Sequence, residues 1–310
     1  MRLAFLFPGQ GSQYVGMGKS LCDEFAEAEH VFQEASDCLG YDVKKLCFEG
    51  PKEELDRTFR TQPCILTSSI AALRCLEENV RPVVVAGHSL GEYSALVAAG
   101  VLKFRDTLKL TEMRGRFMQD AVPEGKGLMA AILGLERERV DYICLSVTRG
   151  YVAPANYNCP GQIVIAGEKD AVEEAIVLAK EAGARRAIPL AVSVPSHCTL
   201  MVDASNRLAD ALKDIEFREP SLPVVNNADA MFLNTTDSIM VSLVKQLDSP
   251  LLWEDSITAI IDSGIDAFIE IGPGKILTGL LRRIDSKVPC FNVEDPESLS
   301  KALEAIHKMS

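Results

Sequence analysis

The amino-acid sequence predicts an α/β protein in which a parallel-sheet subdomain carries an inserted ferredoxin-like subdomain. Strand and helix patterns alternate towards both ends of the chain, and this alternation is typical of α/β folds. Between 126 and 192 the order changes to β-α-β-β-α-β, which is the ferredoxin-like order. We therefore expect 1–125 and 193–310 to form one subdomain and 126–192 to form the other.

The first subdomain begins with the apolar run Leu3–Phe7, which we expect to be a strand. Amphipathic helical patterns follow over Ala26–Leu39 and Gln62–Glu78. The continuously apolar segment Val83–Ala86 is typical of a buried parallel strand, and a helical pattern over Glu92–Ala99 comes soon after it. These segments predict the alternating strands and helices of a parallel sheet.

The remaining elements supply the inserted subdomain and the return to the first one. The insertion is expected to contain, in order, Leu128–Leu133, Glu136–Leu145, Tyr151–Tyr157, Gln162–Ala166, Ala171–Ala182 and Arg186–Ala191. The second and fifth of these segments have helical patterns, and the other four are predicted strands. The helical pattern Leu200–Leu212 and the strand pattern Ala267–Ile271 belong to the first subdomain again.

Composition and charge narrow the classes of function. Hydrophobic residues make up 47% and charged residues 25% of the 310 residues, an ordinary balance for a globular protein. The net charge of -12 argues against nucleic acids and membranes as partners, because nucleic acids and anionic membranes would be repelled. The initial apolar run is too short for a signal peptide and charges interrupt the other runs, so we expect a cytoplasmic protein. The nine cysteines contain no C-x-x-C pair, which favours reduced thiols over a metal site.

The strongest local motif is Gly87-His88-Ser89-Leu90-Gly91, between a predicted strand and a predicted helix. It has the G-x-S-x-G form of a nucleophile elbow, in which a sharp turn holds an exposed serine at a helix N-terminus. The two glycines leave room for that turn, and the helix dipole favours negative charge developing there. The alternative is a serine N-cap in an ordinary turn, but the complete strand-turn-helix context favours a nucleophile.

A serine nucleophile needs a base, and histidine is the usual base near neutral pH. The chain has four histidines. His30 lies among acidic residues of a predicted helix, His307 is close to the C-terminus, and His88 lies inside the elbow with its side chain expected to point away from the serine. His197 lies between a predicted strand and a predicted helix, so elimination favours it as the base. We expect the neighbouring Cys198 to be a buried thiol rather than a nucleophile.

With Ser89 and His197 in these places, the chain resembles the malonyl-CoA:acyl carrier protein transacylases of fatty acid and polyketide synthesis. The resemblance covers nearly the whole chain, and its motifs occur in the family's order. They are Phe7-Pro8-Gly9-Gln10-Gly11-Ser12-Gln13, Gly87-His88-Ser89-Leu90-Gly91-Glu92-Tyr93-Ser94, Met113-Arg114-Gly115-Arg116, Asn156-Tyr157-Asn158-Cys159-Pro160-Gly161-Gln162, Val194-Pro195-Ser196-His197 and Glu270-Ile271-Gly272-Pro273-Gly274-Lys275.

The resemblance implies a hydrolase-like α/β subdomain with a ferredoxin-like insertion. It also implies that the backbone N–H groups of Gln10 and Leu90 form the oxyanion hole, one in a glycine-rich loop and one directly after the nucleophile. A simple tight turn is the alternative for the loop around Gln10. The family motif further selects Arg114 to bind the free malonyl carboxylate, whereas the sequence by itself does not separate Arg114 from Arg116.

The resemblance also assigns the group that orients the histidine. In this family a backbone carbonyl holds the histidine ring, and it is expected here at the residue directly before Trp253, which is Leu252. The family often has glutamine at that position, so this chain departs from the pattern. A carbonyl in this role would explain why no aspartate is marked by its context as a third member of a triad.

The function implied by the resemblance is malonyl transfer from malonyl-CoA to the phosphopantetheine thiol of an acyl carrier protein. The reaction would proceed by a ping-pong mechanism through malonyl-Ser89, in fatty acid biosynthesis, without metal or redox cofactor. Three alternatives remain open. They are a discrete transferase that serves a polyketide synthase, a serine thioesterase or hydrolase, and a non-catalytic module that docks on carrier proteins.

Two basic clusters are candidates for the surface that contacts the carrier. Carrier proteins of this type are generally acidic, and a chain of net charge -12 would not attract them as a whole. A local basic patch near the cavity mouth is therefore expected. Arg185-Arg186 form one candidate cluster, and Lys275 with Arg282-Arg283 form the other.

Overall fold

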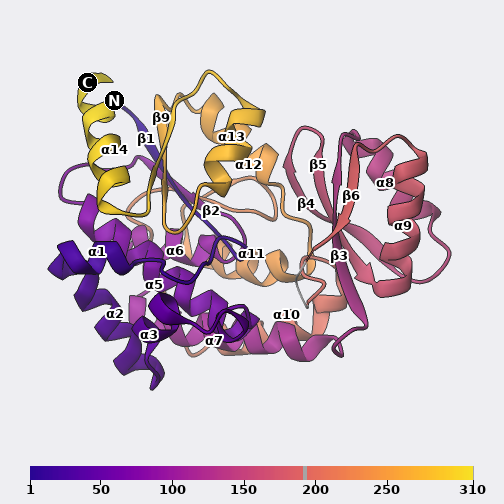
Figure 1. Ribbon diagram of the computed structural model, residues 1–310, viewed down its shortest axis with the longest axis horizontal. Coiled ribbons are helices and arrows are strands. Elements are labelled where there is room, and N and C mark those ends of the chain that lie inside the picture. The colour runs from indigo at the N-terminus through magenta and orange to yellow at the C-terminus, as the bar shows by residue number, and fades with distance from the viewer. Residues whose placement is uncertain (191–193, 310) are drawn as a thin grey trace.

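The protein, described here as a computed structural model for residues 1–190 and 194–309, is organised around two separate sheets (Figure 1). The larger sheet has the strand order β10-β9-β1-β2-β7-β8. All neighbours in it are parallel except β7 and β8, which are antiparallel. Its strands are β1 (Leu3–Phe7), β2 (Val84–Gly87), β7 (Val224–Val225), β8 (Phe232–Leu233), β9 (Ala267–Ile271) and β10 (Cys290–Val293).

Strand β1 lies in the middle of this sheet, between β2 and β9. Ala4 is paired with Val84 on one side and with Phe268 on the other. All five residues of β1 are buried, because successive side chains point to opposite faces and both faces are covered. Phe5 and Phe7 belong to an apolar core with helices α2 (Ala26–Leu39) and α5 (Thr58–Leu76). Leu6 belongs to a second core with α12 (Trp253–Asp262) and α13 (Ile276–Ile284).

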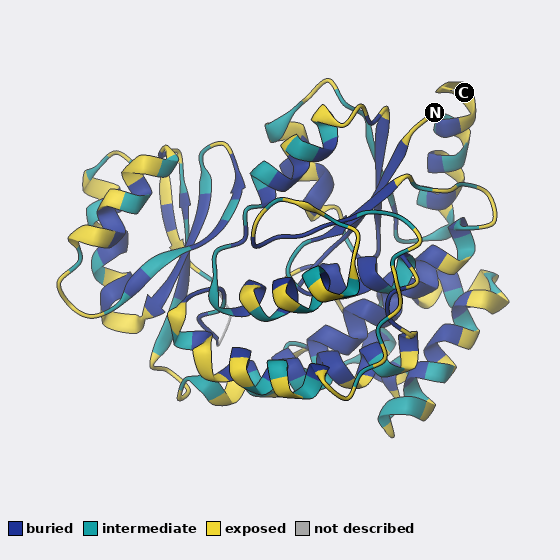
Figure 2. Ribbon diagram, turned by 180° about the vertical axis from the view of Figure 1, so that it is seen from behind, coloured by how far each residue is buried: buried dark blue, intermediate teal, exposed yellow. Residues whose placement is uncertain are grey.

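Helices surround the larger sheet, with buried residues towards it and exposed residues outside (Figure 2). One group precedes the smaller sheet in the sequence: α1 (Lys19–Glu24), α2 (Ala26–Leu39), α3 (Val43–Glu49), α4 (Lys52–Leu55), α5 (Thr58–Leu76), α6 (Gly91–Ala98) and α7 (Phe104–Ala121). The others follow it: η1 (Thr199–Met201), α10 (Val202–Leu212), α11 (Thr236–Asp248), α12 (Trp253–Asp262), α13 (Ile276–Ile284) and α14 (Pro296–Met309). None of the described helices combines the length and apolar character needed to cross a membrane.

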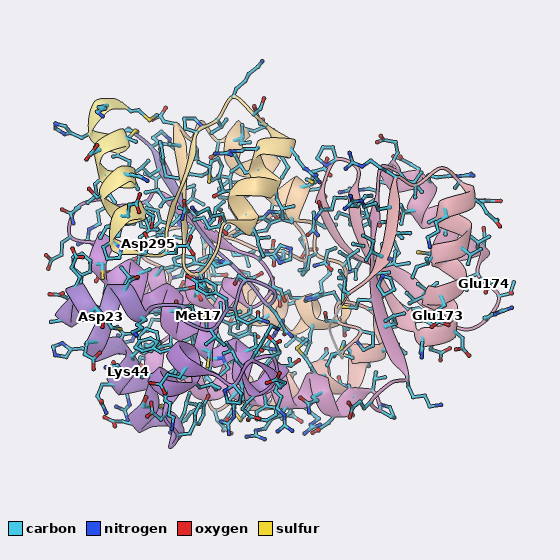
Figure 3. The ribbon with its side chains drawn as sticks, viewed as in Figure 1. Met17, Asp23, Lys44, Glu173, Glu174 and Asp295 are labelled. Carbon is cyan, nitrogen blue, oxygen red and sulfur yellow. The ribbon has the colours of Figure 1, made fainter. Side chains whose placement is uncertain are left out.

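The smaller sheet is antiparallel and has the order β4-β5-β3-β6. Its elements follow the chain as β3 (Gly127–Leu133), α8 (Arg137–Ser146), β4 (Val152–Cys159), β5 (Gln162–Glu168), α9 (Lys169–Glu181) and β6 (Arg186–Pro189). One face packs on α8 and α9. Glu173 and Glu174 lie on α9 at one end of the molecule, whereas Asp23 and Lys44 lie on helices at the other end (Figure 3).

The smaller sheet is joined to the rest of the protein by backbone hydrogen bonds. The Leu251 N–H donates to the Ala155 carbonyl at 2.8 Å, and the Tyr157 N–H donates to the Leu251 carbonyl at 2.9 Å. Ala155 and Tyr157 are on β4, and Leu251 lies two residues before α12. These bonds tie β4 to the segment that leads into α12.

Most predicted elements are confirmed, with differences at their ends. Helix α5 begins at Thr58 rather than Gln62, because buried Thr58 and Thr61 hide the apolar pattern of its first turn. Strand β6 ends at Pro189, and residue 191 of the predicted strand lies outside the described residues. The expected subdomain boundary at 192/193 also lies outside them.

Candidate active site

Ser89 occupies a sharp turn between β2 and α6, and its φ is 51°. This left-handed conformation is uncommon for a residue with a side chain. Two glycines make the turn possible: a Cβ on Gly87 would lie 1.9 Å from the Gly91 carbonyl oxygen, and a Cβ on Gly91 would lie 2.0 Å from the Phe7 carbonyl oxygen. The predicted elbow is therefore present, with its backbone pressed against the end of β1.

His197 reaches the Ser89 hydroxyl. Its Nε2 atom lies 2.8 Å from Ser89 Oγ, and its Nδ1 atom lies 2.8 Å from the backbone carbonyl oxygen of Gln246. The carbonyl can only accept a hydrogen bond, so Nδ1 carries the proton and Nε2 is free to accept the serine proton. Burial, together with the positive charge of Arg114, lowers the pKa of His197 to about 3, which keeps the imidazole neutral.

The expected role of Leu252 is wrong. Its carbonyl oxygen accepts hydrogen bonds from the backbone N–H and the hydroxyl of Ser256, within the first turn of α12. Gln246, at the end of α11, supplies the carbonyl that His197 contacts. The position that the resemblance implied is therefore six residues too far along the chain, and the Leu252 carbonyl is already engaged within α12.

Arg114 lies on α7 with its side chain 1% exposed and its guanidinium in the site. It donates to Ser89 Oγ at 3.3 Å, to Gln62 Oε1 at 2.8 Å and to Gln246 Oε1 at 3.0 Å. Burial lowers its pKa from the usual arginine value. Arg116, two residues along, is on the outside, where it donates to Glu112 at 3.1 Å. The structure therefore separates the two arginines that the sequence by itself left as alternatives.

The backbone amides of Gln10 and Leu90 are close to the elbow because the loop after β1 is pressed against it. A Cβ on Gly9 would lie 2.3 Å from the His88 carbonyl oxygen, so only glycine permits this approach. Gln10 and Leu90 both line the same cavity as Ser89. In the described ranges neither amide N–H donates to another protein group, so both are free to bind an anion.

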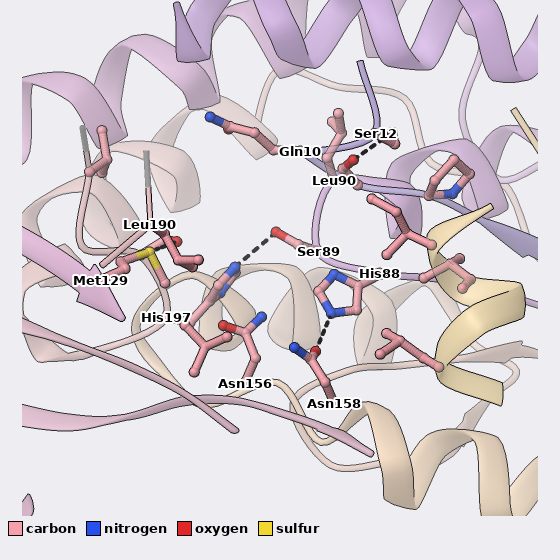
Figure 4. A pocket seen from close by; sticks show the side chains of 18 of the residues that line it. Gln10, Ser12, His88, Ser89, Leu90, Met129, Asn156, Asn158, Leu190 and His197 are labelled. Carbon is pink, nitrogen blue, oxygen red and sulfur yellow. Dashed lines mark hydrogen bonds between the residues drawn. The ribbon is translucent and has the colours of Figure 1, made fainter. Parts of the chain in front are cut away.

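A cavity of about 190 Å³ contains these groups and has two walls (Figure 4). The core wall, carried mainly by the larger sheet and its helices, consists of Gln10, His88, Ser89, Leu90, Arg114 and His197. The sheet wall, carried by the smaller sheet, consists of Met129, Asn156, Asn158, Gln162, Val164 and Leu190. The site therefore lies between the two sheets.

The other histidines do not reach the serine hydroxyl. His88 lines the cavity, but its Nε2 atom contacts Asn158 Oδ1 at 2.9 Å and its ring meets the Trp253 ring edge-on. His30 and His307 are exposed on helices, as expected. Cys198 is buried, and burial raises the pKa of its thiol to about 11, which makes it a poor nucleophile.

The sequence did not predict three buried residues that contact the elbow. Asn227 Oδ1 accepts from the Ser89 N–H at 2.7 Å, and Gln246 Nε2 donates to the Ser89 carbonyl at 3.0 Å. Glu92, on α6, contacts both of these residues. Glu92 lies in a quoted motif, but nothing in the sequence around Asn227 or Gln246 marked their side chains.

Comparisons with known proteins agree with this geometry. The model of the acyl transferase domain family matches residues 4–290. The malonyl CoA-acyl carrier protein transacylase of Escherichia coli (strain K12) is 48% identical over 306 residues, which are 98% of this chain and 99% of that protein. A solved complex of a type II PKS acyl-carrier protein with its malonyl-transacylase has a chain with a TM-score of 0.97 and 49% identity, covering 98% of this chain and 100% of that one.

An acyl carrier protein S-malonyltransferase from Vibrio cholerae has a TM-score of 0.95 and 48% identity. That comparison covers 97% of this chain and 100% of the solved chain. Family model, relatives and solved structures thus agree over nearly the full length. The chain belongs to the malonyl CoA-acyl carrier protein transacylase family of acyl transferases.

Proposed function

We propose that this chain transfers a malonyl group from malonyl-CoA to the phosphopantetheine thiol of an acyl carrier protein, in fatty acid biosynthesis. One observation carries the proposal: Ser89 Oγ lies 2.8 Å from a neutral imidazole nitrogen of His197 and 3.3 Å from the buried guanidinium of Arg114. A nucleophile beside a fixed cation suits an acyl group that has its own carboxylate. The names of the relatives support the same reaction.

The first half-reaction loads the serine. His197 Nε2 accepts the Ser89 proton while Oγ attacks the thioester carbonyl carbon of malonyl-CoA. The negative oxygen that forms is bound by the N–H groups of Gln10 and Leu90. When the intermediate collapses, the carbon–sulfur bond breaks and the coenzyme A sulfur takes the proton from His197. Malonyl-Ser89 and free coenzyme A result.

The second half-reaction transfers the malonyl group from Ser89 to the carrier. His197 accepts the proton of the phosphopantetheine thiol, and the thiolate attacks the ester carbonyl of malonyl-Ser89. The same two N–H groups bind the oxyanion. The carbon–oxygen bond to Ser89 then breaks, and the serine oxygen recovers its proton from His197. The enzyme returns to its starting state, which gives a ping-pong reaction without metal or redox cofactor.

We also propose that the two sheets mark two subdomains. The larger, with residues 1–125 and 193–310, is hydrolase-like, and the smaller, with residues 126–192, is ferredoxin-like. The element sequence β3-α8-β4-β5-α9-β6 supports the second assignment. The elbow at the C-terminal end of the parallel strand β2 supports the first.

The carrier is proposed to dock at a basic rim beside the cavity. Arg186 and Arg283 are both exposed, and Arg283 donates to Gln162 of the sheet wall at 2.6 Å. Gln162 pairs with Leu133 across the sheet, and Leu133 pairs with Arg186 on its other side. Arg186 therefore lies on the same row of the smaller sheet as Gln162, the residue that Arg283 contacts from α13, and we call these two arginines the basic rim.

Intact-protein mass spectrometry tests the loading step. Incubation with malonyl-CoA should add one malonyl group to the wild type and none to Ser89→Ala. Ser94→Ala is the matched control, because Ser94 is a buried serine on α6, the helix after the elbow, and its hydroxyl has no partner among the described residues. An adduct that persists in Ser89→Ala, or that maps to Cys198, would overturn the mechanism.

Two further assays separate the alternatives. In a serine thioesterase, water would release malonate from Ser89 within a turnover, whereas a transferase keeps the ester until a thiol arrives. The solved relative bound to a type II PKS carrier makes a polyketide carrier the second candidate acceptor. Loading of a fatty-acid carrier at a rate equal to or below that of a polyketide carrier would favour this second candidate.

A further inference from the structure

The backbone of Ser89 is held on both sides by side chains that are distant in the sequence. Asn227 Oδ1 accepts from the Ser89 N–H at 2.7 Å, and Asn227 Nδ2 donates to the Gly87 carbonyl at 2.8 Å. Gln246 Nε2 donates to the Ser89 carbonyl at 3.0 Å. Both backbone polar groups of a residue with positive φ are thus engaged by amide side chains.

One buried carboxyl fixes both amide residues. Glu92 is 1% exposed, and its Oε2 atom accepts from the Asn227 backbone N–H at 3.0 Å and from Gln246 Nε2 at 2.9 Å. In the described part of the chain, no lysine or arginine forms an ion pair with Glu92. The carboxyl therefore acts as a hydrogen-bond acceptor for neutral amides.

Gln246 extends the same network to the other reacting groups. Its backbone carbonyl accepts from His197 Nδ1 at 2.8 Å, and its Oε1 atom accepts from Arg114 at 3.0 Å. One residue thus contacts the base, the arginine and the nucleophile's backbone. A shift of Gln246 would move all three relative to one another.

We propose that Glu92, Asn227 and Gln246 are positioning residues that hold the strained Ser89 backbone so that its hydroxyl stays in line with His197. We call these three residues the clamp, and their role rests on the proposed role of Ser89 as the nucleophile. Its chemical content is that acceptor oxygen atoms and amide donors set the position of the nucleophile. Strained backbone persists at functional sites only where surrounding contacts determine it.

The pKa of Glu92 allows both the charged and the neutral carboxyl near neutral pH. Burial raises it to about 7, and the hydrogen bonds from Gln246 and Asn227 oppose that rise. A carboxyl that is largely protonated below that pH still offers one carbonyl oxygen to both donors. Glutamine at this position offers the same oxygen, so Glu92→Gln is a close substitute.

The first test uses two adjacent asparagines. Asn226 and Asn227 are both fully buried, but the Asn226 side chain bonds Ser242 and Met231 rather than the elbow. We expect Asn227→Ala to slow single-turnover malonylation of Ser89 by roughly 10- to 100-fold, as for small misplacements of reacting groups. Asn226→Ala should lose thermal stability comparably while keeping the malonylation rate within about threefold.

A small uncharged fluorophosphonate provides a second readout that does not use Arg114. Ser89 Oγ forms a bond to phosphorus, fluoride leaves, and the serine proton passes to His197. Asn227→Ala should slow this reaction by a factor similar to that for malonylation. Because the reagent reports the nucleophile alone, a wild type that reacts with it but takes no malonyl group contradicts the proposed function and leaves the clamp testable.

Substitutions of Glu92, which accepts the hydrogen bonds from Asn227 and Gln246, complete the test. Glu92→Gln should keep both rates within about threefold of the wild type, whereas Glu92→Leu should match Asn227→Ala. Should Asn227→Ala or Glu92→Leu fail to fold, Gln246→Met removes the side-chain amide and keeps the backbone carbonyl that His197 contacts. The proposal would be overturned if folded clamp variants reacted with the fluorophosphonate as fast as the wild type. Equal rate losses in Asn226→Ala and Asn227→Ala would also overturn it.

Discussion

The two walls of the cavity differ in how their side chains are held. On the core wall, Arg114 and His197 are buried, and hydrogen bonds from several elements fix them. On the sheet wall, Met129, Val164 and Leu190 contribute apolar surface. None of the six residues that define the sheet wall carries a formal charge.

This difference separates residues that act in the chemical steps from residues that shape the cavity around the substrate. Buried charged and polar groups keep their positions only when partners satisfy them, so the core wall is a connected network with little freedom to vary. Apolar contacts are individually small and non-directional, and volume changes there are tolerated better. We therefore expect core-wall substitutions to alter the chemical steps and sheet-wall substitutions to alter substrate fit.

The largest expected effect is at Arg114. Arg114→Ala should reduce malonyl transfer by roughly 30- to 1,000-fold, because a charged hydrogen-bonded contact on the order of 2–4 kcal/mol is lost. Transfer from acetyl-CoA, which lacks the carboxylate, should rise relative to malonyl transfer. Steady-state rates with both substrates measure this. Arg116→Ala is the control on the same helix, and equal losses for the two substrates would contradict the assigned role.

The second prediction concerns pH and the base on the core wall. Protonation as pH falls removes the base, and burial with the charge of Arg114 lowers the pKa of His197 to about 3. Malonylation in single turnovers should therefore stay nearly flat from about pH 6.5 to about 4.5, an interval over which an ordinary histidine would lose roughly 50-fold. In Arg114→Ala the decline should begin at a higher pH. A tenfold loss per pH unit below about 6.5 in the wild type would show that His197 is not held neutral.

The third prediction concerns the basic rim at the edge of the sheet wall. Combined Arg186→Glu and Arg283→Glu should lower kcat/KM for an acidic carrier by roughly 5- to 20-fold at low salt, because rim charges mainly change association rates. Transfer to free pantetheine should not change. Arg218→Glu, at an exposed arginine outside the rim, is the control. A similar loss with pantetheine would mean that the substitutions disturb the cavity and not docking.

The smallest expected effect is on the sheet wall itself. Val164→Ala removes two methyl groups from the cavity lining and should change kcat by less than about threefold. Its effect should appear in the KM for malonyl-CoA. Val177→Ala, at an exposed valine of α9, is the matched control. A loss of kcat as large as that of Arg114→Ala would break the distinction between the walls.

The sequence predicted the elements and the motif residues well because both depend on local patterns. Apolar runs and amphipathic periods located β1, α2 and the inserted elements, and the glycines around Ser89 marked the elbow. Elimination among four histidines identified the imidazole that contacts Ser89. The element and elbow inferences used information within one short stretch of chain, and the elimination compared the local contexts of the four histidines.

The residues that the sequence did not predict come close to Ser89 only through the folding of distant segments. Gln246 meets Ser89 and His197 because α11 crosses below the elbow, and no spacing in the sequence encodes that crossing. Asn227 contacts the elbow because β7 is the next strand beside β2. The error at Leu252 came from the family resemblance, which placed the orienting carbonyl directly before Trp253, whereas the structure has it at Gln246.

The central position of β1 has a consequence for synthesis of the chain. Its partners β2 and β9 are separated by roughly 180 residues, which a ribosome adding ~5–20 residues per second makes in roughly 10 to 40 s. During that interval one edge of a fully apolar strand has no partner, and such edges recruit other chains. The yield of folded protein in a cell therefore depends on how this edge is shielded until β9, near the end of the chain, emerges.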